Sequence, residues 1–276
     1  MRYAPAPGAP FGVEVLSFAR LREMDPEGLR GRTQRPDFHV LALVRSGVGR
    51  HTADFVEHRL RERSVVWIRP GVVHRWTDIE CVDGPLILFR QDVVPTGAAA
   101  AAAADPFAPS TWQLDLPAWE LSVRAARHLG DEQTTAGADP ALASPPVLAH
   151  LLAALVLRVR PPRPAPGPAD GGAQEVFLRY RSAVEAEFAR RHRVTDYARA
   201  LGHSPRTLTR ATRAATGIGA KQFLDQRILL EAKRLLAHTD LPVARCAERL
   251  GFDDAANFTT FFQRQEGTSP SRWRAG

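Results

Sequence analysis

Short apolar or alternating runs recur along residues 11–94, and Gly or Pro stands between most of them. The runs are rich in Val, Ile, Leu, Phe and Trp, which are residues that β-strands favour. Many short strands at this spacing predict an antiparallel β-barrel or jelly roll. The predicted strands are Val13–Phe18, Phe38–Val44, Gly49–Phe55, Ser64–Ile68, Val72–Trp76 and Leu86–Arg90.

Two later segments, residues 117–130 and 145–160, carry the hydrophobic periodicity of helices. In the second segment, apolar residues at successive four-residue steps form one stripe, made of Val147, Leu151, Leu155 and Val159. Packing against the barrel and pairing with a second subunit both fit this stripe. Residues 97–104 are a glycine and a run of alanines, and we expect a low-complexity connector there.

Residues 161–174 are mostly Pro, Ala and Gly, a composition that neither buries apolar surface nor forms helix. This stretch predicts an interdomain linker, and helical periodicity follows it, beginning with a helix over residues 175–191. The expected chain is therefore an α+β two-domain protein. Its parts are a β-domain (1–112), a helical extension that is a candidate dimer contact (113–160), the linker (161–174) and an all-α domain (175–276).

The all-α domain contains an internal near-repeat. Ala198-x-x-Leu201-Gly202 matches Ala247-x-x-Leu250-Gly251 at an offset of 49 residues, and a second helical pattern follows each copy. A small residue lets two helices cross closely, and glycine can adopt the positive φ at which the first helix ends. Ser204-Pro205 supplies an N-cap and a first-turn proline for the next helix. Each copy is therefore predicted to be a helix-turn-helix.

The second helix of each copy has one inward and one outward face. Leu208 points inward in the first copy, and Phe258, Phe261 and Phe262 do so in the second. Such units place the outward face in the major groove of DNA. Between them, Ala220–His238 predicts a helix of roughly 27 Å, close to the ~34 Å between successive major grooves on one side of B-DNA. The outward residues are Arg206, Thr209, Arg210 and Arg213 in the first copy, and Ala256, Thr259, Thr260 and Gln263 in the second, with Ala255 and Asn257 flanking.

Charge separates the two predicted domains. The chain has a net charge of +7, from 37 basic and 30 acidic residues. Residues 175–276 hold 18 basic and 11 acidic residues, a net of +7, whereas residues 1–174 hold 19 of each. A basic domain beside a neutral one indicates a polyanion-binding part joined to a part with another task.

Other features exclude several classes of protein. Cys81 and Cys246 cannot form a disulfide framework, and the sequence has no CxxC spacing for zinc. There is no apolar run of signal-peptide character at the N-terminus, and none of the ~20 residues that a membrane helix needs. We expect a cytoplasmic protein with no membrane partner.

The spaced motifs of residues 175–276 resemble the DNA-binding domain of the AraC/XylS family of bacterial transcription regulators. They are Ala247-Glu-Arg-Leu-Gly251-Phe252, Asn257-Phe258-x-x-Phe261-Phe262, Gly267-x-Ser269-Pro270-x-x-Trp273-Arg274 and, in the connecting helix, Glu231-Ala-Lys-Arg-Leu-Leu236. The resemblance implies double-stranded promoter DNA as partner, and RNA polymerase as well if the protein is an activator. It places base-reading positions at Arg206, Thr207, Thr209, Arg210, Ala255, Ala256, Asn257, Thr259 and Thr260.

The first helix-turn-helix departs from the family at Ala211 and Thr212, where large apolar residues are usual. Burying less apolar surface there is expected to cost on the order of 1–3 kcal/mol of stability. The second outward face is made mostly of small residues, which can contact thymine methyl groups and cannot form bidentate hydrogen bonds. Sequence discrimination is therefore expected to depend on Arg206, Arg210 and Asn257, and phosphate contact is the alternative role for each arginine.

Pro70-Gly71-Val-Val-His74 resembles a short motif of cupins, whose barrels can hold a metal with three histidines and a glutamate. The candidates here are His39, His51 and His74, with Glu57 or His58. Thr52 and Ala53 follow His51, so the His-x-His-x₃₋₄-Glu run is missing, and we expect neither metal nor another cofactor. A ligand-sensing barrel is expected instead. Its cavity would bind a small-molecule effector and would be lined by His39, His51, Trp67, His74 and Trp76. The alternative for the two tryptophans is plain barrel core.

Together these features predict a DNA-binding transcriptional regulator, responsive to a small-molecule effector, and not an enzyme. A rival class is a cupin metalloenzyme, a dioxygenase or isomerase, fused to a DNA-binding domain. A second rival, a methyl-transferring DNA repair regulator, needs reactive and zinc-binding cysteines near the N-terminus, which Cys81 alone cannot supply.

Overall fold

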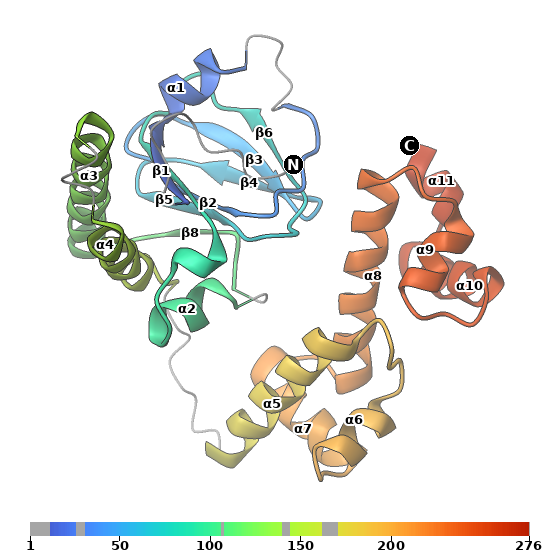
Figure 1. The fold of residues 1–276 in the computed structure, drawn as a ribbon. Helices are drawn as coiled ribbons and strands as arrows, with labels where there is room; N and C mark the ends of the chain where they lie inside the picture. The colour runs from blue at the N-terminus through green and yellow to red at the C-terminus, as the bar shows by residue number, and fades with distance from the viewer. Residues whose placement is uncertain (1–11, 26–30, 106–107, 140–143, 162–170, 276) are drawn as a thin grey trace. The chain divides into compact units, whose positions relative to one another are not determined.

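The computed structural model describes residues 12–25, 31–105, 108–139, 144–161 and 171–275. The chain divides into two compact units, Met1–Pro162 and Arg163–Gly276. The first unit contains all the strands of the described residues and the second is helical, as Figure 1 shows. The expected α+β fold class, an antiparallel β-barrel or jelly roll followed by a helical domain, is confirmed: antiparallel sheets form the first unit and helices the second.

The first unit is built on two antiparallel sheets. A five-stranded sheet has the order β1-β7-β2-β5-β8, and a three-stranded sheet has the order β4-β3-β6. Two of these strands, β4 and β8, were not expected from the sequence, and β6 begins two residues later than predicted. The strands are β1 (Val13–Ser17), β2 (His39–Leu43), β3 (Gly49–Ala53), β4 (Val56–Leu60), β5 (Ser64–Ile68), β6 (His74–Asp78), β7 (Pro85–Phe89) and β8 (Thr111–Gln113).

The five-stranded sheet is buried on both faces. One face joins the second sheet in an apolar core that includes Val40, Ala42 and Trp76. The opposite face, which includes Leu41 and Trp67, packs against helices. All five residues of β2 and all five of β5 are consequently buried.

Helices of the first unit lie beside this sheet (Figure 1). They are α1 (Phe18–Glu23), α2 (Ala98–Ala103), α3 (Leu116–Ala138) and α4 (Pro145–Arg158), with a 3₁₀ turn, η2, at Gln91–Val93. The side chain of Asp115 caps α3 by accepting from the backbone N–H of Ala118 at 2.8 Å. The alanine run expected to be a connector forms α2 instead, because alanine has the highest helix propensity of any residue.

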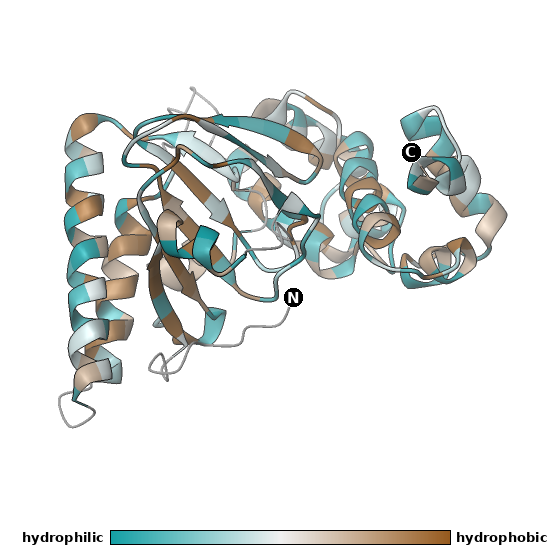
Figure 2. Cartoon of the chain, turned by 90° about the horizontal axis from the view of Figure 1, so that it is seen from above, coloured by the Kyte–Doolittle hydropathy of each residue, from teal (hydrophilic) through white to brown (hydrophobic). Residues whose placement is uncertain are grey.

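The buried face of α4 differs from the predicted stripe. Its buried residues are Leu148, Leu152, Leu155 and Val156, and Val159 follows them, whereas Val147 is 42% exposed. Steps of four residues advance by about 40° around a helix with 3.6 residues per turn, so such a stripe rotates away from the core. Figure 2 shows hydrophobic and hydrophilic bands alternating along α3. Helices α3 and α4 pack into the same core as the five-stranded sheet, and the boundary expected after residue 112 falls inside β8. The parts expected at 1–112 and 113–160 therefore lie in one unit.

The second unit is arranged around α8, the long helix predicted to connect the two repeats. The helices are α5 (Gly171–Glu187), α6 (Val194–Ala200), α7 (Pro205–Thr216), α8 (Ala220–His238), α9 (Val243–Arg249), α10 (Ala255–Glu266) and α11 (Pro270–Ala275). Helices α5–α7 cluster at the first end of α8, and α9–α11 at the other (Figure 1). Helix α5 begins at Gly171, inside the stretch expected to be linker, and it ends at Glu187 rather than at residue 191.

A partly buried ion pair joins α5 to α8. The Arg227 guanidinium donates to both carboxylate oxygens of Glu185, at 2.7 and 2.9 Å, and lies 3.8 Å from the centroid of the Phe188 ring. Arg227 also pairs with Glu231 on its own helix. Its side chain is only 9% exposed, so these contacts hold the connecting helix in a fixed orientation.

Candidate nucleic-acid interface

Helix α7 is formed by the local signals that its sequence carries. Ser204 caps its N-terminus by accepting from the N–H of Thr207 at 3.1 Å, and Pro205 occupies the first turn. Gly217, at a φ of 79°, ends the helix. Leu208 is fully buried, as predicted.

The small residues Ala211 and Thr212 are also buried in α7. The Thr212 hydroxyl donates to the backbone carbonyl of Leu208 at 2.7 Å, so this buried polar group is satisfied within the helix. The first helix-turn-helix therefore packs against its neighbours, although it lacks the large apolar side chains that are usual at these two positions.

The outer face of α7 is strongly basic. Arg206, Arg210 and Arg213 are exposed, and the helix has no acidic residue. Among the residues that the structure describes, these three guanidinium groups have no hydrogen-bond or ion-pair partner. Unpaired cations on an exposed helix face are available to nucleic-acid phosphates and to the edges of guanine bases.

Helix α10 has a different outer surface. Asp254 caps its N-terminus by accepting from the backbone N–H of Asn257 at 2.6 Å. The side-chain amide of Asn257 donates to the same carboxylate at 2.9 Å. Phe258, Phe261 and Phe262 are buried, as predicted, and Phe258 and Phe262 belong to a core shared with α8 and α9.

The two motifs are held at opposite ends of α8, which has 19 residues and a length of roughly 28 Å. Gly251, in the second turn, has a φ of 75° and lies against the backbone that follows α5. His192, in the same backbone segment, hydrogen-bonds the carbonyl of Leu250 at 2.8 Å. These contacts join the second motif to the segment that follows α5, the helix that packs against α7.

A hollow of about 500 Å³ lies between the motifs. Arg213 of α7, Gln265 of α10 and the first turn of α8 line it.

In the first unit, the residues predicted to line one effector pocket lie in two different places, on two different sheets. His39 and Trp67 lie on the helix-covered face, where the Trp67 indole donates to Nδ1 of His39 at 3.2 Å. The His39 Nε2 hydrogen-bonds the Gln91 side chain at 2.7 Å. Burial lowers the pKa of His39 to about 4, and protonation would also set two donors against each other at Nδ1.

His51, His74 and Trp76 lie together on the other side, between the two sheets. The His51 Nε2 and His74 Nδ1 atoms are 3.1 Å apart, and the His51 ring centroid lies 4.5 Å from that of Trp76. Burial, and then the neighbouring His74, lower the pKa of His51 well below its usual value. The five predicted residues are therefore divided between two cores, because His39 and Trp67 point from the five-stranded sheet toward the helices, whereas His51, His74 and Trp76 belong to the three-stranded sheet.

Within the described ranges, no three His, Cys, Asp or Glu side chains come together in a way that could hold a metal ion. The histidines of the predicted cupin set are split in the same way as the pocket, since His39 lies across the sheet from His51 and His74.

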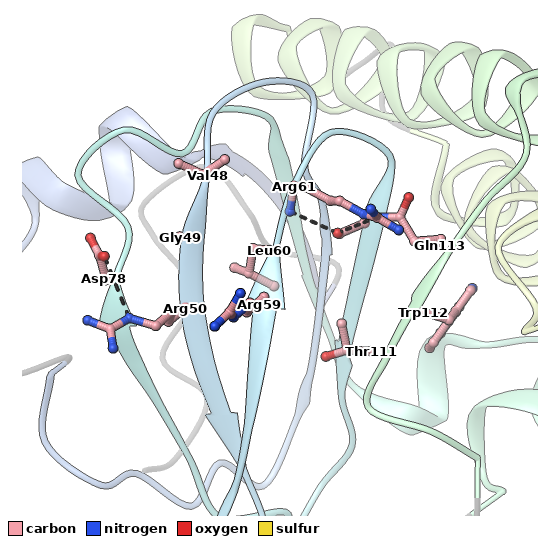
Figure 3. A pocket seen from close by; sticks show the side chains of 11 residues that line it. Val48, Gly49, Arg50, Arg59, Leu60, Arg61, Asp78, Thr111, Trp112 and Gln113 are labelled. Atoms are coloured by element: carbon pink, nitrogen blue, oxygen red, sulfur yellow. Dashed lines mark hydrogen bonds and ion pairs between the residues drawn. The ribbon is translucent and has the colours of Figure 1, made fainter.

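The first unit has a separate groove of about 810 Å³ between β4 and the β5–β8 edge (Figure 3). Leu60, Ser64, Thr111 and Gln113 are among its lining residues, and the Gln113 amide donates to the Ser64 hydroxyl at 2.7 Å. The Thr111 hydroxyl oxygen is buried and has no partner among the described residues. This volume falls in the range of small-molecule sites, roughly 300–1,000 Å³.

Comparison with known families decides the identity of the chain. Residues 197–276 match a helix-turn-helix domain family, and residues 15–159, more than half of the chain, match the AraC-like ligand binding domain. The chain belongs to the AraC family. It is a DNA-binding transcriptional regulator with an N-terminal ligand-binding domain, as its sequence predicted.

Relatives of this AraC-family chain cover most of its length. The transcriptional activator RhaS of Citrobacter koseri is 27% identical over 250 residues, which cover 87% of this chain and 86% of RhaS. The activator RhaR of Salmonella schwarzengrund is 26% identical, covering 86% of this chain and 85% of RhaR. A solved structure, the C-terminal domain of AraT from Geobacillus stearothermophilus, is 29% identical with a TM-score of 0.34, covering 36% of this chain and 84% of that domain.

All ten residues predicted to contact DNA in this AraC-family regulator are accessible. Six of them are exposed and four are half-buried. The exposed residues are Arg206, Arg210, Arg213, Ala256, Asn257 and Thr260, and the half-buried ones are Thr207, Thr209, Ala255 and Thr259.

Sequence reasoning missed the groove residues Thr111 and Gln113, because β8 has only three residues and carries no clear alternation.

In the described part of the chain, no helix combines the length and the hydropathy that crossing a membrane requires.

Proposed function

We propose that the protein binds promoter DNA sequence-specifically through α7 and α10, and that a small-molecule effector controls this binding. The observation that carries the proposal is the row of exposed arginines on α7, which have no partner among the described residues and belong to a motif repeated at both ends of a rigid helix. A face of this kind supplies both counterion release at phosphates and hydrogen-bond donors for bases.

The ten accessible residues take two roles in this proposal. Arg206 and Arg210 read guanine edges, and Arg213 contacts phosphate beside the hollow. The remaining seven contact bases, or the sugar-phosphate backbone next to them. They are Thr207 and Thr209 on α7, and Ala255, Ala256, Asn257, Thr259 and Thr260 on α10.

Selection of duplexes from a random pool by the full chain tests sequence-specific binding. We expect enrichment of one motif with two elements about one helical turn apart, because α8 sets the distance between α7 and α10. An Arg206→Ala, Arg210→Ala variant should lose the enrichment. The control Arg20→Ala changes an exposed arginine of the first unit, which pairs with Glu23, and should keep it. Binding without enrichment of any sequence would refute the proposal.

We propose the groove between β4 and β8 as the effector site, in place of the five residues predicted from the sequence. Its volume and the unpartnered Thr111 hydroxyl support this position. A thermal-shift screen of sugars and small carboxylic acids would identify binders. Thr111→Val keeps the side-chain shape and removes the hydroxyl, so it should weaken a true effector. His51→Gln, at the buried histidine pair, serves as the comparison variant and should destabilise the protein without selectively weakening that compound.

We further propose a cytoplasmic, regulatory role without catalysis, and pairing of two copies through α4. The buried histidine pair falls short of the three-ligand set that a catalytic zinc site has, which supports a regulatory barrel. Val147 and Leu157 are 42% and 41% exposed on α4 and offer an apolar contact to a second copy. Analytical ultracentrifugation of Val147→Arg, Leu157→Arg should show a monomer where the wild type shows a dimer.

The relatives are transcriptional activators, which supports activation through RNA polymerase for this chain as well. In vitro transcription from a template that carries the selected motif would show an increase in transcript with the protein present. A decrease would identify a repressor instead.

A further inference from the structure

The two recognition helices differ in charge. Helix α7 has three arginines and no acidic residue. Helix α10 has Arg264 and Glu266, and two aspartates, Asp253 and Asp254, stand just before it. Lys233 of α8 pairs with Glu266 at 2.6 Å, and Arg264 lies 4.0 Å from an oxygen of Asp225. Among the described residues, the one arginine of α10 thus has an acidic neighbour, whereas the three arginines of α7 have no ion-pair partner.

Hydrogen bonds within the helices already use several of the polar groups on the second recognition face. The Thr259 hydroxyl donates to the Ala255 carbonyl at 2.7 Å. The methyl group of Thr259 is therefore the part of this side chain that is available to DNA. One amide hydrogen of Asn257 is held by Asp254 at 2.9 Å. The side chains of Ala255 and Ala256 are methyl groups. The first turns of α10, which contact base edges in such motifs, thus present mainly methyl groups.

On α7 the arginines remain the groups that are free to donate. Thr209 has its hydroxyl bonded to the Pro205 carbonyl at 2.8 Å, and Thr207 shares a hydrogen bond of 2.9 Å with Ser204. Arg206 and Arg210 have no partner among the described residues and lie one turn apart. Arginine donates in bidentate fashion to O6 and N7 of guanine, and methyl-bearing side chains pack against the C5-methyl of thymine.

We propose that the two motifs read chemically different DNA: α7 reads guanine through Arg206 and Arg210, and α10 reads thymine methyl groups through Ala255, Ala256 and Thr259. The inference rests on the proposed function and specifies its DNA. The operator is asymmetric, with a guanine-containing major groove followed, one turn on, by a thymine-rich one. Helix α7, with three arginines against the one of α10, should contribute more than α10 to the salt dependence of binding.

Base analogues in the selected duplex test this without altering the protein. Replacing thymine by deoxyuracil removes only the C5-methyl, and replacing guanine by 7-deazaguanine removes only the N7 acceptor. Affinity is measured with the full chain by fluorescence anisotropy. Deoxyuracil in one element should weaken binding about 4-fold for each thymine methyl group that α10 contacts. In the other element, 7-deazaguanine should weaken binding about 10-fold.

Protein variants assign each element to its helix. Thr259→Ser removes one methyl group and keeps the hydroxyl, so it should reduce the penalty of deoxyuracil in the thymine element and leave the 7-deazaguanine penalty unchanged. Arg210→Ala should do the reverse. Thr216→Ser is the matched control, because Thr216 lies at the far end of α7 with its hydroxyl bonded to Thr212, and it should change neither penalty.

The possible results separate this inference from the proposed function. If the full chain enriches no duplex, the proposed function fails and the inference fails with it. If a duplex is enriched but deoxyuracil is without effect in both elements, or 7-deazaguanine weakens both elements equally, DNA binding stands and the asymmetric reading is overturned. Penalties confined to opposite elements, each coupled to its own variant, would support it.

Discussion

Gly251 and Gly202 occupy equivalent turns of the two motifs, and the structure predicts different costs for replacing them. Their φ angles are 75° and 70°, so alanine at either position meets the left-handed penalty of about 1–2 kcal/mol. The surroundings differ. A Cβ at Gly251 would lie 2.0 Å from the backbone oxygen of Ala189, whereas a Cβ at Gly202 would have nothing within 4 Å.

The size of the difference follows from this close approach. Carbon–oxygen distances are normally about 3.3 Å or longer, so the two backbone segments must separate by roughly 1.3 Å. Overpacking of this kind costs about 1–3 kcal/mol. Gly202→Ala should therefore lower the free energy of unfolding of the second unit by about 1–2 kcal/mol, and Gly251→Ala by about 2–5 kcal/mol.

Hydrogen exchange followed by mass spectrometry measures this in the full chain, because peptides from α9 and α10 report on the second unit alone. Each 1.4 kcal/mol corresponds to a tenfold change, so Gly251→Ala should exchange about 5- to 150-fold faster than Gly202→Ala. Asparagine tolerates positive φ, so Gly202→Asn should recover stability and Gly251→Asn should not. Equal exchange in the two alanine variants would refute the close approach to Ala189.

Three further predictions concern other parts of the chain. The pKa of His39 is lowered to about 4, below its unfolded value near 6.5, so the first unit should lose about 3 kcal/mol of stability as pH falls from 6.5 to 4. Urea unfolding followed by tryptophan fluorescence measures this, and His39→Gln should flatten the dependence. Leu152→Ala should cost about 2–5 kcal/mol, and Val147→Ala, at an exposed position of the same helix, less than about 0.5 kcal/mol; equal melting temperatures would contradict the packing of α4. Arg213→Ala should weaken binding equally on all duplexes and reduce the slope of log affinity against log salt by about 1, whereas a loss confined to the selected duplex would indicate base reading.

The helix-turn-helix units could be predicted because their signals are local. Ser204, Pro205 and the turn glycines act within a few residues of the helix ends that they define. The inward phenylalanines of α10 follow from the helical period alone. None of these features depends on a distant part of the chain, so the sequence and the structure agree on them.

The faces on which His39 and Trp67 lie could not be predicted, for the opposite reason. Strands β2 and β5 are buried on both faces, by the second sheet and by the helices, so they show no polar–apolar alternation. Without alternation the parity of His39 and Trp67 is undetermined, and a shift of one residue exchanges the two faces. Which face meets the helices depends on how distant segments pack together.

The edge strands β4 and β8 were not predicted, for a different reason. Strand β4 has the sequence VEHRL and is largely exposed, and β8 has only three residues, so neither resembles a buried strand. The groove proposed for the effector lies between these two strands. In contrast, the helix at Ala98–Ala103 was within reach of sequence reasoning, because six consecutive alanines favour a helix on propensity alone.

The central claim is that the exposed arginines of α7 read bases, and one ratio tests it most directly. It is the dissociation constant for a scrambled duplex divided by that for the selected duplex, measured at one salt concentration with wild type and Arg210→Ala. The wild type should give a ratio of about 10³ or more. Arg210→Ala should lower this ratio about 5- to 150-fold, the equivalent of about 1–3 kcal/mol for the bidentate hydrogen bonds that one arginine makes to a guanine. Equal weakening on both duplexes, with the ratio unchanged, would contradict the claim and assign Arg210 to phosphate.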